Sequence, residues 1–434
     1  MKIGVLGLWH LGSVYSACLA ELGHYVIGIS DDRATVDALR RRRPSVAEPQ
    51  LVGLITKNQK RRTLVYDSDF SVLGQCDVVW VAIDTPVDEN DQAQIQPVFD
   101  YAQKAARYFR ADVLLVVSSQ LSVGMSQKIV DSVKKWRPGL RFFYAYVPEN
   151  LRLGEAVHSF FEPGRIVIGS DHLESIKRVQ AVFRDIKTDF LPMRVASAEM
   201  TKHALNSFLA TSLSFIYDIA DVCEKTGADI VEVARALRSD ARIGHGAYLD
   251  ASIGFSGGTL ARDLSFLVAA AKRNKISVPV IRAVLEKNRR RRILVIDRLA
   301  SHVGDLRRAN VAILGLTYKS GTNTLRRSLA LEIAADLYRR GAKLALCDPA
   351  VDAEELKQCL ADTHFSFSKN WQTTVKGCQA ALVVTPWPTL RAIDFRVMQK
   401  HMKTPAVLLD ARNFFSMRQA QAESAGLMYL GIGR

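Results

Sequence analysis

The chain has 434 residues, a formal net charge of +15 at pH 7, and a composition that is 48% hydrophobic and 24% charged. Its length exceeds what one ordinary hydrophobic core accommodates, so we expect two or three domains. The composition excludes a disordered or fibrous protein. No uncharged apolar run approaches the roughly 18 residues that a membrane-spanning helix needs.

The positive charge suggests acidic partners. Nucleic acid is disfavoured because no aromatic-interleaved basic motif or known binding module is present. The run Arg289–Arg292 lies within a helical pattern and is interpreted as a solvated or interface-lining helix face. A ligand that carries a diphosphate would use a few of the other cationic groups. We therefore expect neither nucleic acid nor a membrane as a partner.

The six cysteines are scattered, without the paired spacing of a disulfide framework or a metal site. Most fall in apolar segments, so we expect reduced, buried thiols, no metal and a cytoplasmic location. The first twenty residues, with Lys2 followed by an apolar stretch and Ser16–Ala20, faintly resemble a signal peptide. A strand, a glycine turn and a helix explain the same residues better.

In chain order, short β-branched runs alternate with amphipathic segments over the first 190 or so residues, which is typical of βαβ units. Strands are predicted at Lys2–Gly7, Tyr25–Ser30, Val78–Ile83, Val113–Ser118, Phe142–Tyr146 and Ile166–Gly169. From about Ser197 to His302 the pattern is helical, with a glycine-rich interruption at Gly244–Gly258. Further strands are predicted at Val311–Leu314, Lys343–Cys347, Ala381–Val384 and Val407–Leu409. The fold class is therefore α/β, with two doubly wound domains on parallel sheets joined by a helical middle.

The sequence Gly7-Leu-Trp-His-Leu-Gly12 follows the first strand and opens a helix, as a dinucleotide-binding fingerprint does. The outer glycines serve the tight turn and the close packing of helix on strand, and the middle position lets a pyrophosphate approach the backbone. That middle position is Trp9, which should crowd the approach. A Rossmann domain that has lost its cofactor stays open as an alternative.

The second strand should end in an acidic residue that holds the ribose. Ser30 stands there, with Asp31 and Asp32 just after it. Arg33 could indicate a 2′-phosphate, but the two carboxylates before it would repel one.

Further segments fit a longer pattern that runs from Lys2 to Arg434. They are Ala47–Pro49, Thr85-Pro86, Val147–Arg152, Pro163–Gly169, Ala198-Glu199 with Lys202 and Asn206, Asp240–Gly244, Gly254–Asp263, Gly315–Lys319 with Arg326 and Ser328, Asp348-Pro349, Thr385–Trp387 and Asp410–Asn413. Together they resemble the UDP-glucose/GDP-mannose dehydrogenases, which oxidise the C6 alcohol of a nucleotide sugar to a carboxylate with two NAD⁺. The resemblance implies two Rossmann-like domains bridged by a long helix that supports a homodimer. It divides the chain into a dinucleotide-binding domain at 1–196, a central dimerisation and catalytic region at 197–302, and a nucleotide-sugar-binding domain at 303–434.

The resemblance also implies catalytic roles. Lys202 and Asn206 lie four residues apart on a predicted helix, so both meet one face, where a cation and an amide suit an oxygen that gains negative charge. Glu149 would be a general base or position a water. Asp263 would orient a water or a proton-shuttling lysine. Each role has a structural alternative. Lys202 and Asn206 could be a helix surface pair, Glu149 a carboxylate that caps its loop, and Asp263 a charge in the first turn of the next helix.

The cofactor implied is NAD, and the positions that match its binding residues are Gly7, Trp9, His10, Leu11, Gly12, Ser30, Asp31, Thr85, Pro86, Ser119, Gln120 and Arg326. The nucleotide-sugar substrate would contact Leu151, Arg242 from the neighbouring subunit, Tyr248, Gly254, Gly257, Lys319 and Arg412. Jointly, the arginines and the lysine supply the charge that a diphosphate requires.

Three substitutions depart from the family pattern at functional positions. Thr259 replaces the cysteine nucleophile, Arg262 replaces a lysine, and Gln120 replaces the threonine after Ser119. The second oxidation in the family passes through a thiohemiacetal and a thioester, which need a thiolate. A threonine hydroxyl is far less acidic, so a covalent intermediate on Thr259 is not expected.

The first hydride transfer does not need that sulfur. We therefore expect an enzyme that binds a nucleotide sugar and releases less NADH per substrate than its relatives, with a slower second oxidation through the aldehyde hydrate left open. Two alternatives remain, namely a non-catalytic binding or regulatory protein and a dehydrogenase that acts on a different nucleotide sugar. The retention of Glu149, Lys202, Asn206 and Asp263 argues against complete loss of catalysis.

Overall fold

The computed structural model of the chain describes residues 1–85, 95–149, 151–255 and 259–434. It divides into two compact units, Met1–Ala204 and Leu205–Arg434. In these ranges, no helix has the length and apolar character needed to cross a membrane. All six cysteines are free thiols, and only Cys359 is exposed, so the expectation of mostly buried thiols is confirmed.

The first unit contains an eight-stranded sheet in the order β3-β2-β1-β4-β5-β6-β7-β8. Its strands are β1 (Lys2–Leu6), β2 (Tyr25–Ile29), β3 (Leu64–Asp67), β4 (Val78–Val81), β5 (Val113–Val117), β6 (Phe142–Tyr146), β7 (Ile166–Gly169) and β8 (Phe190–Met193). The first six follow the Rossmann order, which reverses direction between β1 and β4. The six predicted strands are confirmed to within two residues. Two expectations were wrong, because β7 pairs with β6 in the antiparallel sense and because β3 and β8 were not predicted.

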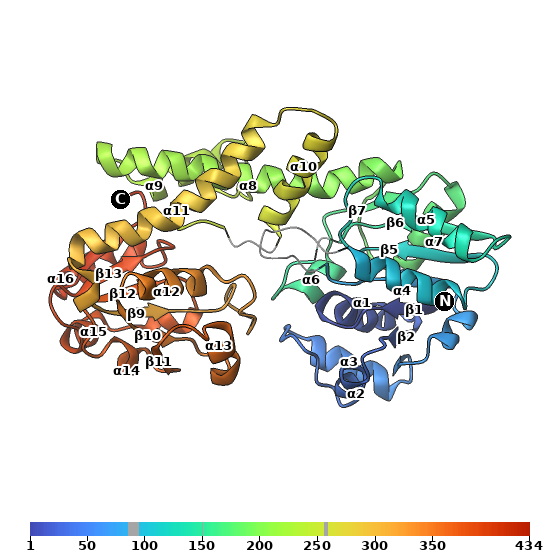
Figure 1. Cartoon of the computed structure of the whole chain (residues 1–434), viewed down its shortest axis with the longest axis horizontal. Coiled ribbons are helices and arrows are strands. Elements are labelled where there is room, and N and C mark those ends of the chain that lie inside the picture. Colours follow the sequence, from blue (N-terminus) through green and yellow to red (C-terminus); the bar gives the residue numbers. More distant parts are fainter. Residues whose placement is uncertain (86–94, 150, 256–258) are drawn as a thin grey trace. The chain divides into compact units, whose positions relative to one another are not determined.

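Helices cover both faces of this sheet (Figure 1). They are α1 (His10–Glu21), α2 (Arg33–Arg40), α3 (Leu51–Lys60), α4 (Gln96–Ala106), α5 (Met125–Trp136), α6 (Ala156–Phe161) and α7 (Leu173–Val182), with the 3₁₀ helix η1 (Phe70–Gln75). One buried apolar cluster joins the sheet to α1, α2, α3, α6 and α7, and another joins it to η1, α4 and α5. Because both faces are covered, the central strands are nearly continuous apolar runs, which is why they were predictable.

The predicted helical middle is confirmed. Helix α8 (Val195–Thr226) is one continuous helix, drawn in green in Figure 1, and it begins in the first unit and ends in the second. It is followed by α9 (Ile230–Ser239), α10 (Leu260–Arg273) and α11 (Pro279–Val303). The interpretation of Arg289–Arg292 as a solvated face of α11 is only half correct. Arg289 and Arg290 are exposed, but Arg291 is buried, pairs with Asp221 of α8 and donates to the carbonyl of Ser252 at 2.9 Å.

The second unit contains a six-stranded, wholly parallel sheet in the order β11-β10-β9-β12-β13-β14. Its strands are β9 (Asn310–Leu314), β10 (Lys343–Cys347), β11 (Phe365–Ser368), β12 (Ala380–Val383), β13 (Val407–Asp410) and β14 (Met428–Gly431). Its helices are α12 (Leu329–Arg339), α13 (Ala353–Cys359), α14 (Trp371–Val375), α15 (Phe395–His401) and α16 (Gln419–Ser424), with 3₁₀ helices η2 (Leu306–Arg308), η3 (Pro388–Ala392) and η4 (Ser416–Arg418). The strands β11 and β14 were not predicted.

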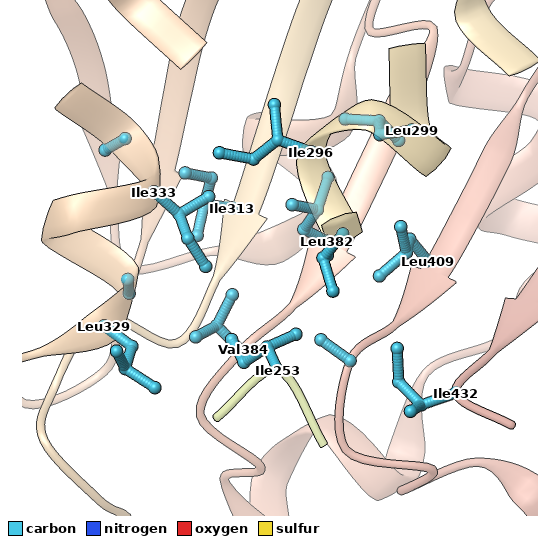
Figure 2. Packing of buried hydrophobic residues seen from close by; sticks show 14 of the residues in the cluster. Ile253, Ile296, Leu299, Ile313, Leu329, Ile333, Leu382, Val384, Leu409 and Ile432 are labelled. Carbon is cyan, nitrogen blue, oxygen red and sulfur yellow. The ribbon is translucent and has the colours of Figure 1, made fainter. Parts of the chain in front are cut away.

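The core of the second unit lies where α11 and α12 pack on this sheet. Figure 2 shows Ile296 of α11 and Ile333 of α12 close to Ile313 and Leu382 of the sheet, with Ile253 of the glycine-rich stretch beside them. All five side chains are fully buried. Burial of each contributes about 1.5–3 kcal/mol, so the stretch before Gly254 is fixed by the same core that holds the sheet.

Candidate active site

The turn between β1 and α1 has the geometry that the fingerprint requires. Gly7 adopts φ +88°, and a Cβ there would lie 2.7 Å from Cγ1 of Ile83. A Cβ on Gly12 would lie 1.5 Å from the carbonyl oxygen of Gly7, so no other residue fits at position 12. Trp9 immediately precedes α1 and is 38% exposed, outside the buried core. The turn therefore fits a dinucleotide at both outer glycines, and the effect of Trp9 stays a prediction.

A carboxylate lies at the N-terminus of α1. The backbone N–H of Leu11 donates to Oδ2 of Asp84 at 3.3 Å. Helix α1 has no acidic residue in its own first turn, and Trp9 makes no side-chain capping bond. Asp84 lies at the carboxyl end of β4, beside β1, so the contact forms where the order of the sheet reverses.

At the end of β2, Asp31 is held by two groups from α4. Its carboxylate accepts hydrogen bonds from Tyr101 and Lys104, and the hydroxyl of Ser30 lies 3.4 Å from that of Tyr101. Partial burial alone would raise the pKa of Asp31, but the bonds from Lys104 and Tyr101 outweigh it and lower the pKa below its ordinary value. Asp32 caps α2 by accepting from the N–H of Ala34 at 3.0 Å. Of the two carboxylates that follow Ser30, Asp32 is used as a helix cap and Asp31 is not.

Hydrogen bonds connect the segments that follow β4 and β5, and they involve three of the predicted cofactor residues, Thr85, Ser119 and Gln120. The N–H of Ile83 donates to Oγ of Ser119 at 2.9 Å, and Oγ1 of Thr85 donates to the carbonyl of Gln120 at 3.1 Å. Ser119, Gln120 and Thr85 are all buried. Pro86 lies outside the described residues.

His10, the first residue of α1, is bonded to a buried carboxylate that the sequence did not mark as functional. Its Nε2 lies 2.9 Å from Oε2 of Glu48, whose side chain is fully buried. The same carboxylate accepts from the N–H of Gly154 and of Ala156, both at 2.8 Å. Glu48 thus joins the start of α1 to the segment that follows Leu151.

Glu149 and Lys202 form a shielded ion pair within the first unit. Nζ of Lys202 lies 3.1 Å from Oε1 of Glu149 and donates to the carbonyl of the same residue at 2.6 Å. The exposed fractions of the two side chains are 6% for Lys202 and 16% for Glu149. Oε2 of Glu149 accepts from the N–H of Leu151 at 3.0 Å, so Glu149 caps its loop and faces a lysine at the same time.

Asn206 and Asp263 meet within the second unit. Both are buried, and Nδ2 of Asn206 donates to Oδ2 of Asp263. Asp263 lies in the first turn of α10, four residues after the N-cap residue Thr259, whose side chain makes no capping bond. Lys202 and Asn206 both lie on α8 and both are buried, which excludes the alternative of an exposed surface pair.

Thr259 has Tyr318 as a neighbour in the second unit. Burial raises the pKa of Tyr318, and a hydrogen bond with Thr259 together with the charge of Arg412 partly opposes that rise. The Tyr318 hydroxyl therefore stays protonated near neutrality.

Arg412 is anchored on backbone and side-chain oxygens of the second unit. Its Nε donates to the carbonyl of Val384 at 3.1 Å, and its Nη1 donates to Oγ of Ser252 at 3.2 Å. Burial lowers the pKa of its guanidinium. Lys319 follows β9 and is half-buried, whereas Arg326 is exposed and lies in the second unit, unlike the other predicted cofactor residues.

The remaining predicted substrate residues lie in the glycine-rich stretch and, in the case of Arg242, just before it. Arg242 is exposed and makes a bidentate contact with Asp240, at 3.0 and 2.7 Å. Tyr248 lines an open pocket of about 360 Å³ with Leu213, Arg238, His245 and Asp250. Gly254 adopts φ +124°, and a Cβ there would lie 2.8 Å from Oδ1 of Asn288 on α11. Gly257 lies outside the described residues.

Two Rossmann-like sheets, a glycine turn shaped for a dinucleotide, and a shielded lysine–carboxylate pair define a dinucleotide-dependent oxidoreductase. Comparison with known proteins is more specific. Models of the UDP-glucose/GDP-mannose dehydrogenase family match residues 1–187 (NAD binding domain), 196–290 (central domain) and 312–417 (UDP binding domain). The chain belongs to this family and is an NAD-dependent oxidoreductase of the nucleotide-sugar dehydrogenase class.

Among the similar proteins are UDP-glucose 6-dehydrogenases TuaD and YwqF of Bacillus subtilis. They are 31% and 30% identical over the whole chain, which covers 93% and 98% of their lengths. A UDP-glucose dehydrogenase from the archaeon Pyrobaculum islandicum has a solved structure that is 27% identical and superposes with a TM-score of 0.91, covering 100% of this chain and 97% of that one.

Proposed function

We propose that this protein oxidises the C6 alcohol of a nucleoside-diphosphate hexose, UDP-glucose or a close relative, with NAD. The observation that carries the proposal is the shielded pair of Lys202 and Glu149, a cation and a carboxylate held together in the unit that contains the segment matched by the NAD binding domain model. The names of the similar UDP-glucose 6-dehydrogenases support the choice of sugar.

In the proposed reaction, Lys202 and the amide of Asn206, four residues apart on α8, stabilise the C6 oxygen as it gains negative charge. Glu149 accepts the hydroxyl proton, directly or through a water. NAD, when bound, accepts the hydride. Arg412 and Lys319, with Arg242 of a neighbouring subunit, hold the diphosphate.

One departure of this chain from the family pattern, Thr259, bears on the second oxidation. The phenol of Tyr318, which neighbours Thr259, stays protonated near neutrality and so does not act as the base that a threonine nucleophile needs. We therefore propose that oxidation halts at the aldehyde or continues slowly through the hydrate, for which Asp263 or Glu149 would take the proton.

The test counts NADH formed against sugar consumed and identifies the product by mass, with a panel of nucleotide sugars. The wild type should give about one NADH per sugar in the fast phase. Thr259→Cys should raise acid formation, and Thr259→Ser, which keeps a hydroxyl, should not. Two NADH per sugar at a single fast rate in the wild type would contradict the impaired second step. Binding of both ligands with no NADH at all would favour a non-catalytic binding protein.

We further propose that the chain acts as a homodimer built on α8. Phe208, Phe215 and Val222 recur every seven residues on this helix and are 70%, 51% and 58% exposed. A stripe of this kind is typical of a face that a partner covers, and a second copy would also supply the exposed Arg242. Sedimentation of the wild type against Phe215→Glu tests it, since a monomeric wild type would contradict the proposal.

The three segments 1–196, 197–302 and 303–434 are proposed as the cofactor-binding, central and nucleotide-sugar-binding domains. Limited proteolysis with and without NAD tests the first boundary, because ligand should protect the first segment selectively.

A further inference from the structure

The carboxylate of Asp84 lies at the N-terminus of α1, where it accepts a hydrogen bond from the N–H of Leu11. The first N–H groups of a helix have no partner within the helix and carry the positive end of its dipole. In a dinucleotide-binding turn, these groups receive the pyrophosphate. An anionic side chain here therefore uses the same donors that a bound cofactor needs.

Asp84 also supplies the N-terminal cap that α1 lacks among its own residues. Trp9 offers no side-chain cap, and the first turn of α1 contains no acidic residue. The Asp84 carboxylate is thus a cap supplied from another strand, 73 residues along the chain. Its position is fixed because β4 pairs with β1 and because the N–H of Ile83, the preceding residue, is bonded to Ser119.

We propose that Asp84 limits the affinity for the cofactor, because it caps α1 in the free protein and competes with the pyrophosphate for the N–H of Leu11. The inference rests on the proposed use of NAD at this turn. Because Asp84 is half-buried, its repulsion of a diphosphate is only partly screened by solvent. It follows that the residue stabilises the unliganded fold and weakens cofactor binding, two effects of opposite sign at one position.

The test is Asp84→Asn, which keeps an acceptor oxygen for Leu11 and removes the charge. Asp131→Asn on α5 is the matched control, because it removes the same charge from an exposed position of the same unit. NAD and ADP-ribose are titrated by calorimetry into the full chain, in EDTA and again with an excess of MgCl₂, and thermal unfolding is recorded without ligand. ADP-ribose carries the pyrophosphate but no nicotinamide.

We expect Asp84→Asn to bind NAD and ADP-ribose at least about fivefold more tightly than the wild type, since removal of a like charge at close range in a partly screened site is worth that much or more. Its unliganded melting temperature should fall, while the control changes neither quantity. Unchanged or weaker binding in Asp84→Asn would overturn the inference. If Asp84→Asn binds NAD and ADP-ribose more weakly than the wild type only when Mg²⁺ is present, the inference is also overturned, and the result would indicate a cation shared by Asp84 and the phosphates.

Failure of the proposed function gives a different result. If the wild type binds no NAD, the assignment of the cofactor fails. The inference about Asp84 then stands only if Asp84→Asn acquires binding of ADP-ribose, and it is overturned if the variant binds none. A variant that does not fold is replaced by Asp84→Ser, which keeps an oxygen acceptor without the charge, and the same titrations apply.

Discussion

Replacement of Glu48 by glutamine should loosen the segment that follows the proposed base Glu149. The Glu48 carboxylate is fully buried and accepts three hydrogen bonds, from Nε2 of His10 and from the N–H groups of Gly154 and Ala156. A glutamine amide has only one acceptor oxygen. In either orientation, its NH₂ group therefore faces at least one backbone N–H that it cannot satisfy.

The magnitude follows from those contacts. Loss of one hydrogen bond to a charged group, with a buried donor left unsatisfied, costs about 2–4 kcal/mol. The exposed Glu162→Gln, whose carboxylate lies 3.6 Å from Nδ1 of His158, is the control and should stay within about 0.5 kcal/mol.

Urea unfolding gives the loss of stability, and hydrogen exchange of the peptide that spans residues 152–160 gives its location. We expect faster exchange at Gly154 and Ala156 in the variant, together with a fall in kcat of about tenfold or more, since small displacements of a catalytic group are costly. Equal urea midpoints and equal protection of these amides in wild type and variant would refute the reasoning.

Three further predictions concern the two units separately. Gly12→Ala should abolish NAD binding and lower the melting temperature, because its Cβ would meet the carbonyl of Gly7 at 1.5 Å; a variant that binds NAD normally would contradict the turn geometry. The folded pKa of Asp31 is lowered, so its contribution to stability should be present above its unfolded pKa and lost as pH falls through the folded value; Asp31→Asn should flatten the acid limb of a melting-temperature profile and weaken NAD binding, and an unchanged profile would count against it. Arg412→Lys should raise the KM for the nucleotide sugar about tenfold with a smaller change in kcat, because a lysine cannot reproduce both anchoring bonds; equal KM values would remove Arg412 from the diphosphate site.

The four strands that were not predicted from the sequence all lie at the edges of the sheets. β3 and β8 are the two edges of the first sheet, and β11 and β14 are the two edges of the second. Central strands of a parallel sheet are buried on both faces and read as apolar runs, whereas the edge strands β3, β8 and β11 are only partly buried. β11 reads Phe-Ser-Phe-Ser, and β8 contains a proline, which is tolerated at an edge. The fold class could be predicted because it depends on the central strands.

The candidate site likewise contains residues that could be predicted from the sequence and contacts that could not. Residues in contiguous motifs, such as Gly7–Gly12 or Lys202 with Asn206, could be predicted because a turn or a helix fixes their relation. The partners of these residues lie far along the chain. Glu48 contacts amides 106 and 108 residues away, and Asp84 contacts an amide 73 residues away. Only tertiary packing brings such groups together, and no local pattern encodes it.

The surroundings of Thr259 bear on the chemistry more than its identity alone does. A cysteine at this position would need a neighbour that favours the thiolate, and a threonine would need a base that removes its proton. The neighbour is Tyr318, and burial keeps this phenol protonated, so it donates or accepts a hydrogen bond without taking a proton near neutrality. Asp263, on the same helix, is already bonded to Asn206. In the proposed reaction, the first oxidation needs a hydride acceptor, which is NAD, and groups that stabilise an oxygen and accept one proton, which are the roles proposed for Lys202, Asn206 and Glu149. The covalent route through the second oxidation needs an activated nucleophile at position 259, and the protonated phenol of Tyr318 does not supply the base for it.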